Sequence, residues 1–421
     1  MLGAGARRRQ DVQGLRAIAV LYVVVFHAGL PWDGGFTGVD VFFVISGFVI
    51  TGVLAREQHA TGRLDLWRFY SRRVKRLLPA LAVMLVAVSI LGVVAAPVGG
   101  VTNGTGTGIF AALFSANLYV YRLSTGYFDL DSELNPLLHT WTLGVEEQLY
   151  VGFSLLLLAS WALARRRGGD GRAIVLGAVA AVTVGSFAVA LAAPEKLAFY
   201  GSPARAWEVG VGALIALLAV WIRRLPARAA AALGVLGAAA LALTGPLVGE
   251  GSGTPAVSVL LPVAGTCALL AAGTSAATVT TRLLSWSPLV WIGDVSYSWY
   301  LWHWPLIVFA TALWPSDGSG PAAVAAAVSL LPAWLSYRYV ENPIRFNPRI
   351  QGRRVLALAA TCVVVPIVAC GGWRAVNSYM TNHLDTLVAV HDSRRLTAGE
   401  VRGCRGAYAP LPARPACTWT V

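Results

Sequence analysis

Two ionisable side chains lie in the first apolar run of the chain, where a lipid-spanning helix should not tolerate them. The run from Leu15 to Leu30 carries Arg16 at its start and His27 near its end. Eleven helical steps separate the two, so on a helix they share a face and lie roughly 16 Å apart along the axis. Placing an arginine in lipid costs roughly 2.5–3.5 kcal/mol on insertion scales, so such residues are expected to be functional.

A carboxylate, Asp40, lies in the second apolar run. The short turn between the two runs is centred on Asp33 and Gly34, so His27 and Asp40 are equidistant from it. An antiparallel helical hairpin would place them at similar depth, and a carboxylate beside an imidazole fixes its tautomer and raises its basicity. The pattern predicts a catalytic His27 oriented by Asp40. A paired histidine that only joins two helices is the alternative.

The fourth apolar segment opens with HTWTLGVEEQLY and carries adjacent carboxylates, Glu146 and Glu147. His139 and Glu146 are seven residues apart and Tyr150 follows Glu146 by four, so a helix would put all three on one face. Two carboxylates inside an apolar helix need a partner arginine, a substrate or a proton. We predict a catalytic role for Glu146, with a structural ion pair as the open alternative.

Aromatic residues surround a second histidine in the segment WIGDVSYSWYLWHWP. His303 shares a helical face with Ser296, and Tyr300 lies three residues before it. Interfacial aromatic belts explain part of this composition but not the histidine. Tyr300 and His303, together with His139 and Tyr150, are predicted to bind the acceptor of a reaction or to move protons.

The segment 63–80 interleaves cationic side chains with apolar ones. Its cations include Arg72, Arg73, Lys75 and Arg76, between leucines and aromatic residues. This pattern predicts an amphipathic helix lying at the cytoplasmic membrane surface. Anchoring to lipid headgroups and binding of a polyanionic ligand, such as a phosphorylated cofactor, are both compatible with it.

Composition identifies the class of protein. Of the 421 residues, 57% are hydrophobic and only 13% are charged, against roughly 25% charged in soluble domains. The chain carries a net charge of +13, but its Lys and Arg lie in short clusters between apolar runs. That is the positive-inside pattern of a multi-pass cell-membrane protein, and it argues against nucleic-acid binding. The five cysteines show no metal-ligand spacing, so no metal is expected.

The elements that must position these residues are transmembrane helices. Hydropathy predicts an all-α bundle of about 10–11 spans, at 12–30, 36–55, 78–97, 138–163, 173–193, 204–222, 229–247, 255–274, 289–313, 322–340 and 354–374. Basic and acidic loops alternate along the chain, which predicts a cytoplasmic N-terminus and an extracytoplasmic C-terminus. We divide the chain into a transmembrane domain at 1–350, an extra transmembrane helix at 354–374 and an extracytoplasmic tail at 375–421.

Six ordered segments resemble the acyltransferase-3 family of integral-membrane acyltransferases over about residues 9–350. They are QGLRAIAVLYVVVFHAG, GVDVFFVISGFVI, FYSRRVKRLLPA, HTWTLGVEEQLY, WIGDVSYSWYLWHWP and ENPIR. The resemblance implies transfer of an acyl group, often acetyl, from cytoplasmic acyl-CoA to a hydroxyl of an extracytoplasmic glycan or other exported acceptor. It also implies that Arg16 and His27 are an essential pair, that Arg73 and Arg76 are the family's arginine pair, and that Glu146 is functionally important.

Larger members of the family carry an extracytoplasmic SGNH-type domain after an eleventh span. The tail from Cys404 resembles the start of the linker to that domain. The resemblance therefore implies either a truncated chain or a separate SGNH-type partner protein on the acceptor side.

The resulting hypothesis is a transfer reaction through the membrane. The CoA phosphates dock on Arg72, Arg73, Lys75 and Arg76, and the pantetheine arm passes Arg16 on its way to His27. His27 then takes a proton from the acceptor hydroxyl, or carries the acyl group itself. The alternative is a proton-coupled transporter or flippase of an envelope precursor, because intramembrane His, Asp and Glu residues can also form a proton relay. A non-catalytic scaffold is a further alternative.

Overall fold

The computed structural model describes residues 8–94, 104–123, 134–168, 171–249, 255–314 and 318–395, and the elements formed within these ranges are all helical. The chain divides into two compact units, Met1–Trp373 and Arg374–Val421. The first unit contains all of the predicted site residues. Residues 396–421, which include most of the predicted tail, lie outside the described ranges.

The first half of the chain forms two long hairpins and a set of short helices. The elements in order are α1 (Gln10–His27), η1 (Asp33–Thr37), α2 (Gly38–Thr61), α3 (Leu66–Val94), α4 (Gly104–Ala112), α5 (Ala116–Arg122), η3 (Leu138–Thr140), α7 (Trp141–Arg166), α8 (Arg172–Ala192), α9 (Glu195–Tyr200), α10 (Ser202–Leu217) and α11 (Ala219–Ile222). Here η1 and η3 are 3₁₀ turns.

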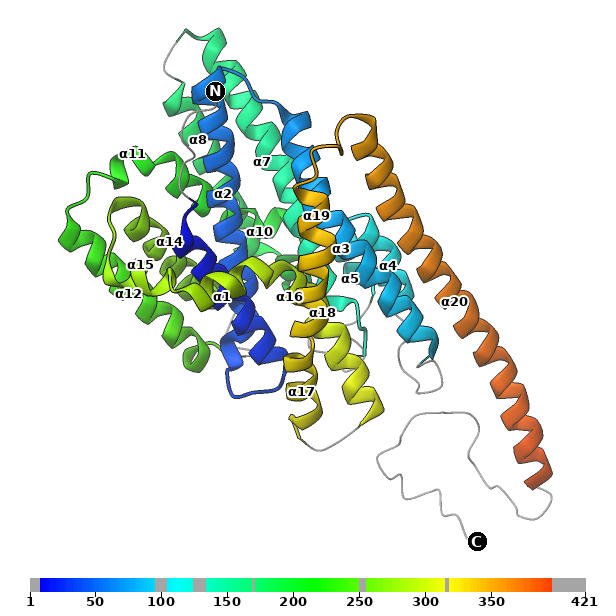
Figure 1. Ribbon diagram of the computed structural model, residues 1–421. Coiled ribbons are helices and arrows are strands. Elements are labelled where there is room, and N and C mark those ends of the chain that lie inside the picture. Colours follow the sequence, from blue (N-terminus) through cyan, green and yellow to red (C-terminus); the bar gives the residue numbers. More distant parts are fainter. Residues whose placement is uncertain are drawn as a thin grey trace. The chain divides into compact units, whose positions relative to one another are not determined.

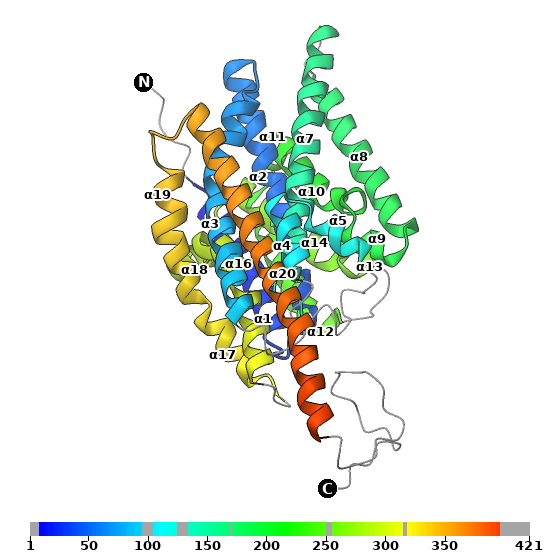
Figure 2. The same cartoon turned by 90° about the vertical axis from the view of Figure 1, so that its right-hand side faces the viewer.

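The second half contributes the central helix of the unit. Its elements are α12 (Ala227–Leu247), α13 (Pro255–Ser258), α14 (Leu260–Ser275), α15 (Val279–Leu284), α16 (Ser287–Leu313), α17 (Gly320–Val328), α18 (Leu330–Ser336), the π-helical turn η4 (Tyr337–Glu341), α19 (Asn342–Arg345) and α20 (Arg353–Arg395). Figure 1 shows α12, α14 and α15 grouped together, and Figure 2 shows α17, α18 and α19 following one another end to end.

Each of the eleven predicted spans coincides with a helix or with consecutive helices, so the all-α, multi-pass architecture is confirmed. Within the described ranges, eight helical segments are long and apolar enough to cross a membrane. They comprise α2, α3, α7, α8, α12, α14, the α17–α19 series and the first part of α20. The helices α1, α10 and α16 are not among them, although they carry Arg16, Arg205 and His303, which are discussed below.

Two boundaries differ from the prediction. The basic segment 63–80 is not a separate helix on the membrane surface, because residues from Leu66 onward are the first turns of the continuous 29-residue α3. Phe69 and Leu78 of this segment are buried against neighbouring helices, whereas Trp67 is exposed. In addition, α20 does not end near residue 374 but continues to Arg395.

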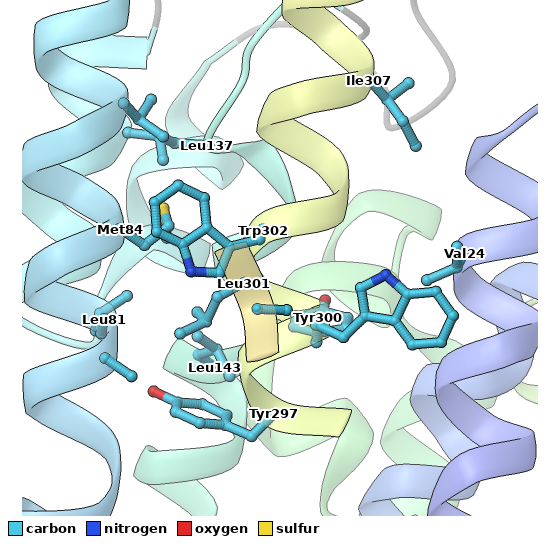
Figure 3. Close-up of a cluster of buried hydrophobic side chains, with 14 of the residues drawn as sticks. Val24, Leu81, Met84, Leu137, Leu143, Tyr297, Tyr300, Leu301, Trp302 and Ile307 are labelled. Carbon is cyan, nitrogen blue, oxygen red and sulfur yellow. The ribbon is translucent and has the colours of Figure 1, made fainter. Parts of the chain in front are cut away.

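The helix α16 lies at the centre of the first unit. Its apolar side chains pack against α1, α3 and α7 in one buried cluster, and Figure 3 shows Tyr297, Tyr300, Leu301 and Trp302 of α16 between α3 on one side and α1 on the other. Because α16 fills the space between the other helices, every residue from Val295 to Pro305 is buried, and the polar groups on this stretch are removed from solvent.

Glycines allow α1 and α16 to approach until their backbones touch. A Cβ at Gly293 of α16 would overlap the backbone oxygen of Gln13 on α1, and a Cβ at Gly14 would overlap the backbone oxygen of Leu284 in α15. Small residues at such crossings are the usual way for membrane helices to pack closely. This close crossing fixes α1 relative to α16.

Candidate active site

A direct hydrogen bond joins two of the predicted histidines. His27 is the last residue of α1, and its Nδ1 lies 2.9 Å from Nε2 of His303 on α16. The two rings are stacked at 12°, and the ring of Trp304 packs 4.5 Å from that of His27. His303 is fully buried, whereas His27 is partly exposed. The sequence predicted both residues but not their contact.

The third histidine, His139, lies beside this pair in the turn η3, which precedes α7. Its ring meets that of His303 edge to face, with centroids 5.6 Å apart. Tyr300 lies against both rings and donates a hydrogen bond from its hydroxyl to the carbonyl of His139 at 2.9 Å. His139 belongs to η3, the turn that leads directly into α7, and its ring contacts that of His303.

A proline in α16 supports this arrangement. Pro305 has no backbone N–H, so it leaves the carbonyl four residues earlier, that of Leu301, without its helical partner. The Nε2 of His139 lies 3.2 Å from this oxygen and donates to it. Sequence alone shows the proline two residues after His303, but not which side chain uses the released carbonyl.

A cavity of about 480 Å³ lies next to the histidines. Most of its lining residues belong to single faces of α2, α3, α7 and α16. On α2 the lining residues follow helical spacing from Val39 through Ser46 to Val53, and on α3 they run from Phe69 to Leu77. Most of the wall is apolar and aromatic, as is usual for ligand pockets.

The inner end of the cavity is formed by Tyr300 of α16 and Thr142 of α7, whose hydroxyls are 2.6 Å apart. His27 and His303 do not line the cavity. His303 is three residues beyond Tyr300, which is roughly 4.5 Å along the helix axis. The cavity therefore ends about one helical turn short of the histidine pair.

The other end of the cavity is rich in cations. Five arginines line it: Arg16, Arg72, Arg73, Arg76 and Arg345. Against them stand three carboxylates in or beside the lining, which are Glu146, Glu147 and Glu341. The arginines therefore give this end a net positive charge, and we call it the basic mouth.

Arg16 is the one arginine of the five that belongs to α1. Within the described part of the chain, its guanidinium hydrogen-bonds only to the side chain of Gln13, at 3.3 Å. A guanidinium that is partly buried without a carboxylate favours binding of an anion. The prediction that Arg16 contacts a ligand on its way inward is consistent with this position.

Arg73 is held firmly by two residues of α7. Its guanidinium forms an ion pair with Glu147 and lies 3.6 Å from the centre of the Tyr150 ring. The adjacent carboxylate, Glu146, accepts hydrogen bonds from Tyr150 at 2.6 Å and Ser46 at 2.5 Å. Glu146 and Tyr150 share a helical face, as predicted, and the structure adds a hydrogen bond between them. The two adjacent carboxylates have different partners.

A second carboxylate organises two arginines of the basic mouth. Glu341, in the π-helical turn η4, lies 3.5 Å from Arg345 and 3.9 Å from Arg76, and it accepts a hydrogen bond from Ser298 of α16. Glu341 is almost fully buried at 1% exposure. Sequence spacing allows either Arg338 or Arg345 to pair with Glu341; in the structure Arg345 does so and also lines the cavity.

The proposed pairing of Asp40 with His27 is wrong. Asp40 accepts a 2.5 Å hydrogen bond from Arg205 of α10, and Arg205 also pairs with Glu208 at 3.2 Å. These three residues are buried between α2 and α10. A hairpin places His27 and Asp40 at similar depth, but their side chains leave α1 and α2 in different directions, which linear spacing does not show.

The remaining predicted cations differ in position. Arg72 is exposed at the edge of the basic mouth. Lys75 does not line the cavity, and its ammonium group donates to the backbone oxygen of Asn347 at 3.3 Å. Among the described residues, no group of three or more His, Cys, Asp or Glu side chains is placed to hold a metal ion.

Several residues of the site were not predicted. Ser46, Thr142 and Arg345 all contribute polar atoms to the cavity. Ser46 lies six residues after Asp40 in an apolar run. A small polar residue in such a run was the only feature of the sequence that could have pointed to it. Arg345 had a stronger signal, because it follows Glu341 at the helical spacing of four.

Comparison with known proteins gives a consistent result. A family model described as an acyltransferase domain matches residues 9–339. The peptidoglycan O-acetyltransferase OatA of Listeria monocytogenes is 32% identical, covering 80% of this chain and 56% of the relative. The O-acetyltransferase OatA of Staphylococcus aureus is 29% identical, covering 85% of this chain and 62% of the relative. The chain thus spans about three fifths of these curated relatives, and no solved structure matches it.

Proposed function

The chain belongs to the family of acyltransferase domains, and from that premise we propose that it transfers an acetyl group from cytoplasmic acetyl-CoA to a hydroxyl of an extracytoplasmic cell-wall glycan. The Listeria and Staphylococcus relatives are both named O-acetyltransferases, and the name of the Listeria protein specifies peptidoglycan. This supports acetyl as the acyl group and a glycan as the acceptor.

One observation carries the proposal. A single cavity has an arginine-rich mouth and an inner end that lies about one helical turn from the His27–His303 pair. Arginines bind phosphate oxygens through paired N–H groups, which suits the phosphates of CoA. The apolar walls suit the aliphatic pantetheine arm. The volume of about 480 Å³ lies within the range typical of small-molecule sites, roughly 300–1,000 Å³.

The residues then have distinct tasks. Arg16, Arg76 and Arg345 bind the anionic part of the donor at the basic mouth. Glu147 and Tyr150 hold Arg73 against the same wall. Because Tyr300 and Thr142 close the inner end, the Tyr300 side chain must turn aside before an acyl group reaches His27.

The chemistry at His27 is general-base catalysis. His27 takes the proton of the acceptor hydroxyl as that oxygen bonds to the acyl carbon. The carbon–sulfur bond of the thioester breaks, and the departing thiolate takes the proton back from the His27 imidazolium to give the free thiol and neutral His27. In a covalent variant the imidazole nitrogen itself accepts the acyl group first and passes it to the hydroxyl second.

The proposed orientation has the basic mouth at the cytoplasmic face and His27 toward the outside. The positive-inside distribution of Lys and Arg supports it. In this orientation the N-terminus is cytoplasmic, and an SGNH-type domain on this or another protein would receive the acyl group or present the glycan on the outer side.

Reconstituted transfer tests the function. Purified protein in liposomes, given radiolabelled acetyl-CoA on the basic-mouth side and peptidoglycan fragments on the other, should yield O-acetylated glycan by mass spectrometry. His27→Ala should lose transfer while keeping its melting temperature, and His59→Ala, an exposed histidine at the end of α2, is the matched control. Near-normal transfer by His27→Ala would contradict the proposal.

A further inference from the structure

The hydrogen bonds of His303 determine which of its nitrogens carries the proton. Its Nδ1 lies 2.8 Å from the carbonyl oxygen of Tyr300 and 3.2 Å from that of Trp299. Carbonyl oxygens only accept hydrogen bonds, so Nδ1 is the protonated nitrogen. His303 is 0% exposed, and none of the described carboxylates hydrogen-bonds to it, so the neutral form is favoured.

The tautomer of His303 fixes that of His27. A neutral imidazole with its hydrogen on Nδ1 has its lone pair on Nε2. This Nε2 lies 2.9 Å from Nδ1 of His27, so it accepts and His27 Nδ1 donates. In neutral His27 the lone pair is consequently on Nε2, the nitrogen that can take a proton from a substrate.

From this chain of hydrogen bonds we infer that His303 is a positioning residue that holds His27 in the Nδ1–H tautomer and thereby makes Nε2 of His27 the reacting nitrogen. The inference deepens the proposed function and rests on it for its catalytic consequence. In many catalytic sites a carboxylate accepts a hydrogen bond from the ring N–H of the histidine and so sets its tautomer. Here a second imidazole, that of His303, has this role.

A neutral partner suits this location. Burying an ionised carboxylate beside His27 would require its desolvation, which costs on the order of several kcal/mol per ion. Asp40 avoids that problem only because Arg205 binds it. An imidazole accepts the same hydrogen bond without a charge.

The pair also provides a place for positive charge. When Nε2 of His27 takes the acceptor's proton, His27 becomes an imidazolium, and its Nδ1 proton can move along the 2.9 Å hydrogen bond to Nε2 of His303. His303 then carries the charge and keeps donating from Nδ1 to the carbonyl of Tyr300. One proton enters the pair and the charge is shared by two rings.

Two substitutions at His303 separate positioning from packing. The side-chain oxygen of His303→Gln can accept from His27 Nδ1, whereas His303→Leu offers no acceptor at similar volume. Loss of tautomer control lowers kcat by about 10⁴-fold in serine-protease triads. We expect a loss of about 10²-fold or more in kcat for His303→Leu, with KM for acetyl-CoA within about threefold and with most of kcat retained by His303→Gln. His59→Gln is the matched control.

Nitrogen NMR gives a readout that does not depend on activity. In ¹⁵N-histidine-labelled protein, His27 should show an unprotonated Nε2 and a protonated Nδ1, assigned by its loss in His27→Ala. In His303→Leu this signal should change to the Nε2–H form that free imidazoles prefer. A protonated Nε2 on His27 in the unmodified protein would overturn the inference, as would equal kcat losses for the Gln and Leu variants with an unchanged tautomer. Failure of acetyl transfer in the unmodified protein, with the Nδ1–H tautomer observed, would count against the proposed function alone.

Discussion

Arg205 on α10 donates a 2.5 Å hydrogen bond to Asp40 on α2, and this pair joins the two helices at a point where both side chains are almost fully buried. Glu208, one turn along α10, binds the same guanidinium at 3.2 Å. Two carboxylates therefore share one cation away from solvent. The group has a structural role between α2 and α10, and Asp40 does not contact the histidines.

Within this group, replacing Arg205 should lower the stability of the fold more than replacing Asp40. Arg205→Met leaves two carboxylates buried without a cation and should cost about 3–5 kcal/mol, the range for breaking a buried ion pair. Asp40→Asn leaves one cation with one carboxylate and should cost much less, with kcat near normal. Thermal unfolding in detergent and kcat measure the two effects. If Asp40→Asn abolished turnover in a stably folded protein, Asp40 would have to act on His27 after all.

Glu341 should affect donor binding more than chemistry. Glu341→Gln weakens the hold on Arg76 and Arg345 at the basic mouth, so we expect KM for acetyl-CoA to rise about 5- to 20-fold with kcat within about threefold. One lost charge-assisted contact corresponds to roughly 1–2 kcal/mol. Initial rates over a range of acetyl-CoA concentrations measure both constants.

The control for this substitution is Glu195→Gln, which removes an exposed carboxylate on α9. It should leave both constants unchanged. A fall in kcat at unchanged KM for Glu341→Gln would place Glu341 in the chemical step, contrary to its position at the mouth.

Replacing Pro305 should lower kcat without lowering the melting temperature. Pro305→Ala supplies a backbone N–H that can bond to the carbonyl of Leu301, in competition with Nε2 of His139. An interior proline costs a helix about 3 kcal/mol or more, so the melting temperature should rise or stay the same. We expect kcat to fall at least about fivefold, because His139 and the neighbouring His303 lose their fixed positions. Pro366→Ala, which removes the interior proline of α20, should leave kcat unchanged.

The α1–α16 crossing should be sensitive to a single methyl group. A Cβ at Gly293 would overlap the backbone of Gln13, so Gly293→Ala must push α1 away from α16 and lengthen the His27–His303 contact. Overpacking of this kind typically costs about 1–3 kcal/mol. We expect lower stability and a loss of kcat.

The matched control is Gly152→Ala on α7, where a Cβ would have no neighbour within 4 Å. It should preserve both stability and kcat. Normal kcat in Gly293→Ala would show that the contact between α1 and α16 tolerates a shift of about one methyl radius.

The sequence determined the helical, multi-pass architecture, because hydropathy and charge act locally and are readable one segment at a time. It also predicted that Arg16, His27, Glu146 and His303 are unusual, because an ionisable residue in an apolar run is conspicuous without any knowledge of its neighbours. The Glu146–Tyr150 hydrogen bond was predictable too, since both residues lie on one helix at a spacing of four.

Only the tertiary structure decided which helices bring these residues together. His27 is bound by His303, 276 positions later, and Asp40 by Arg205, 165 positions later. Such contacts depend on the direction in which each side chain leaves its helix and on which helices cross, and glycine contacts such as that of Gly293 with Gln13 set those crossings. The cavity likewise exists only where single faces of α2, α3, α7 and α16 meet. The spacing of residues along one helix fixes the face they share, but the partner opposite that face is chosen by packing.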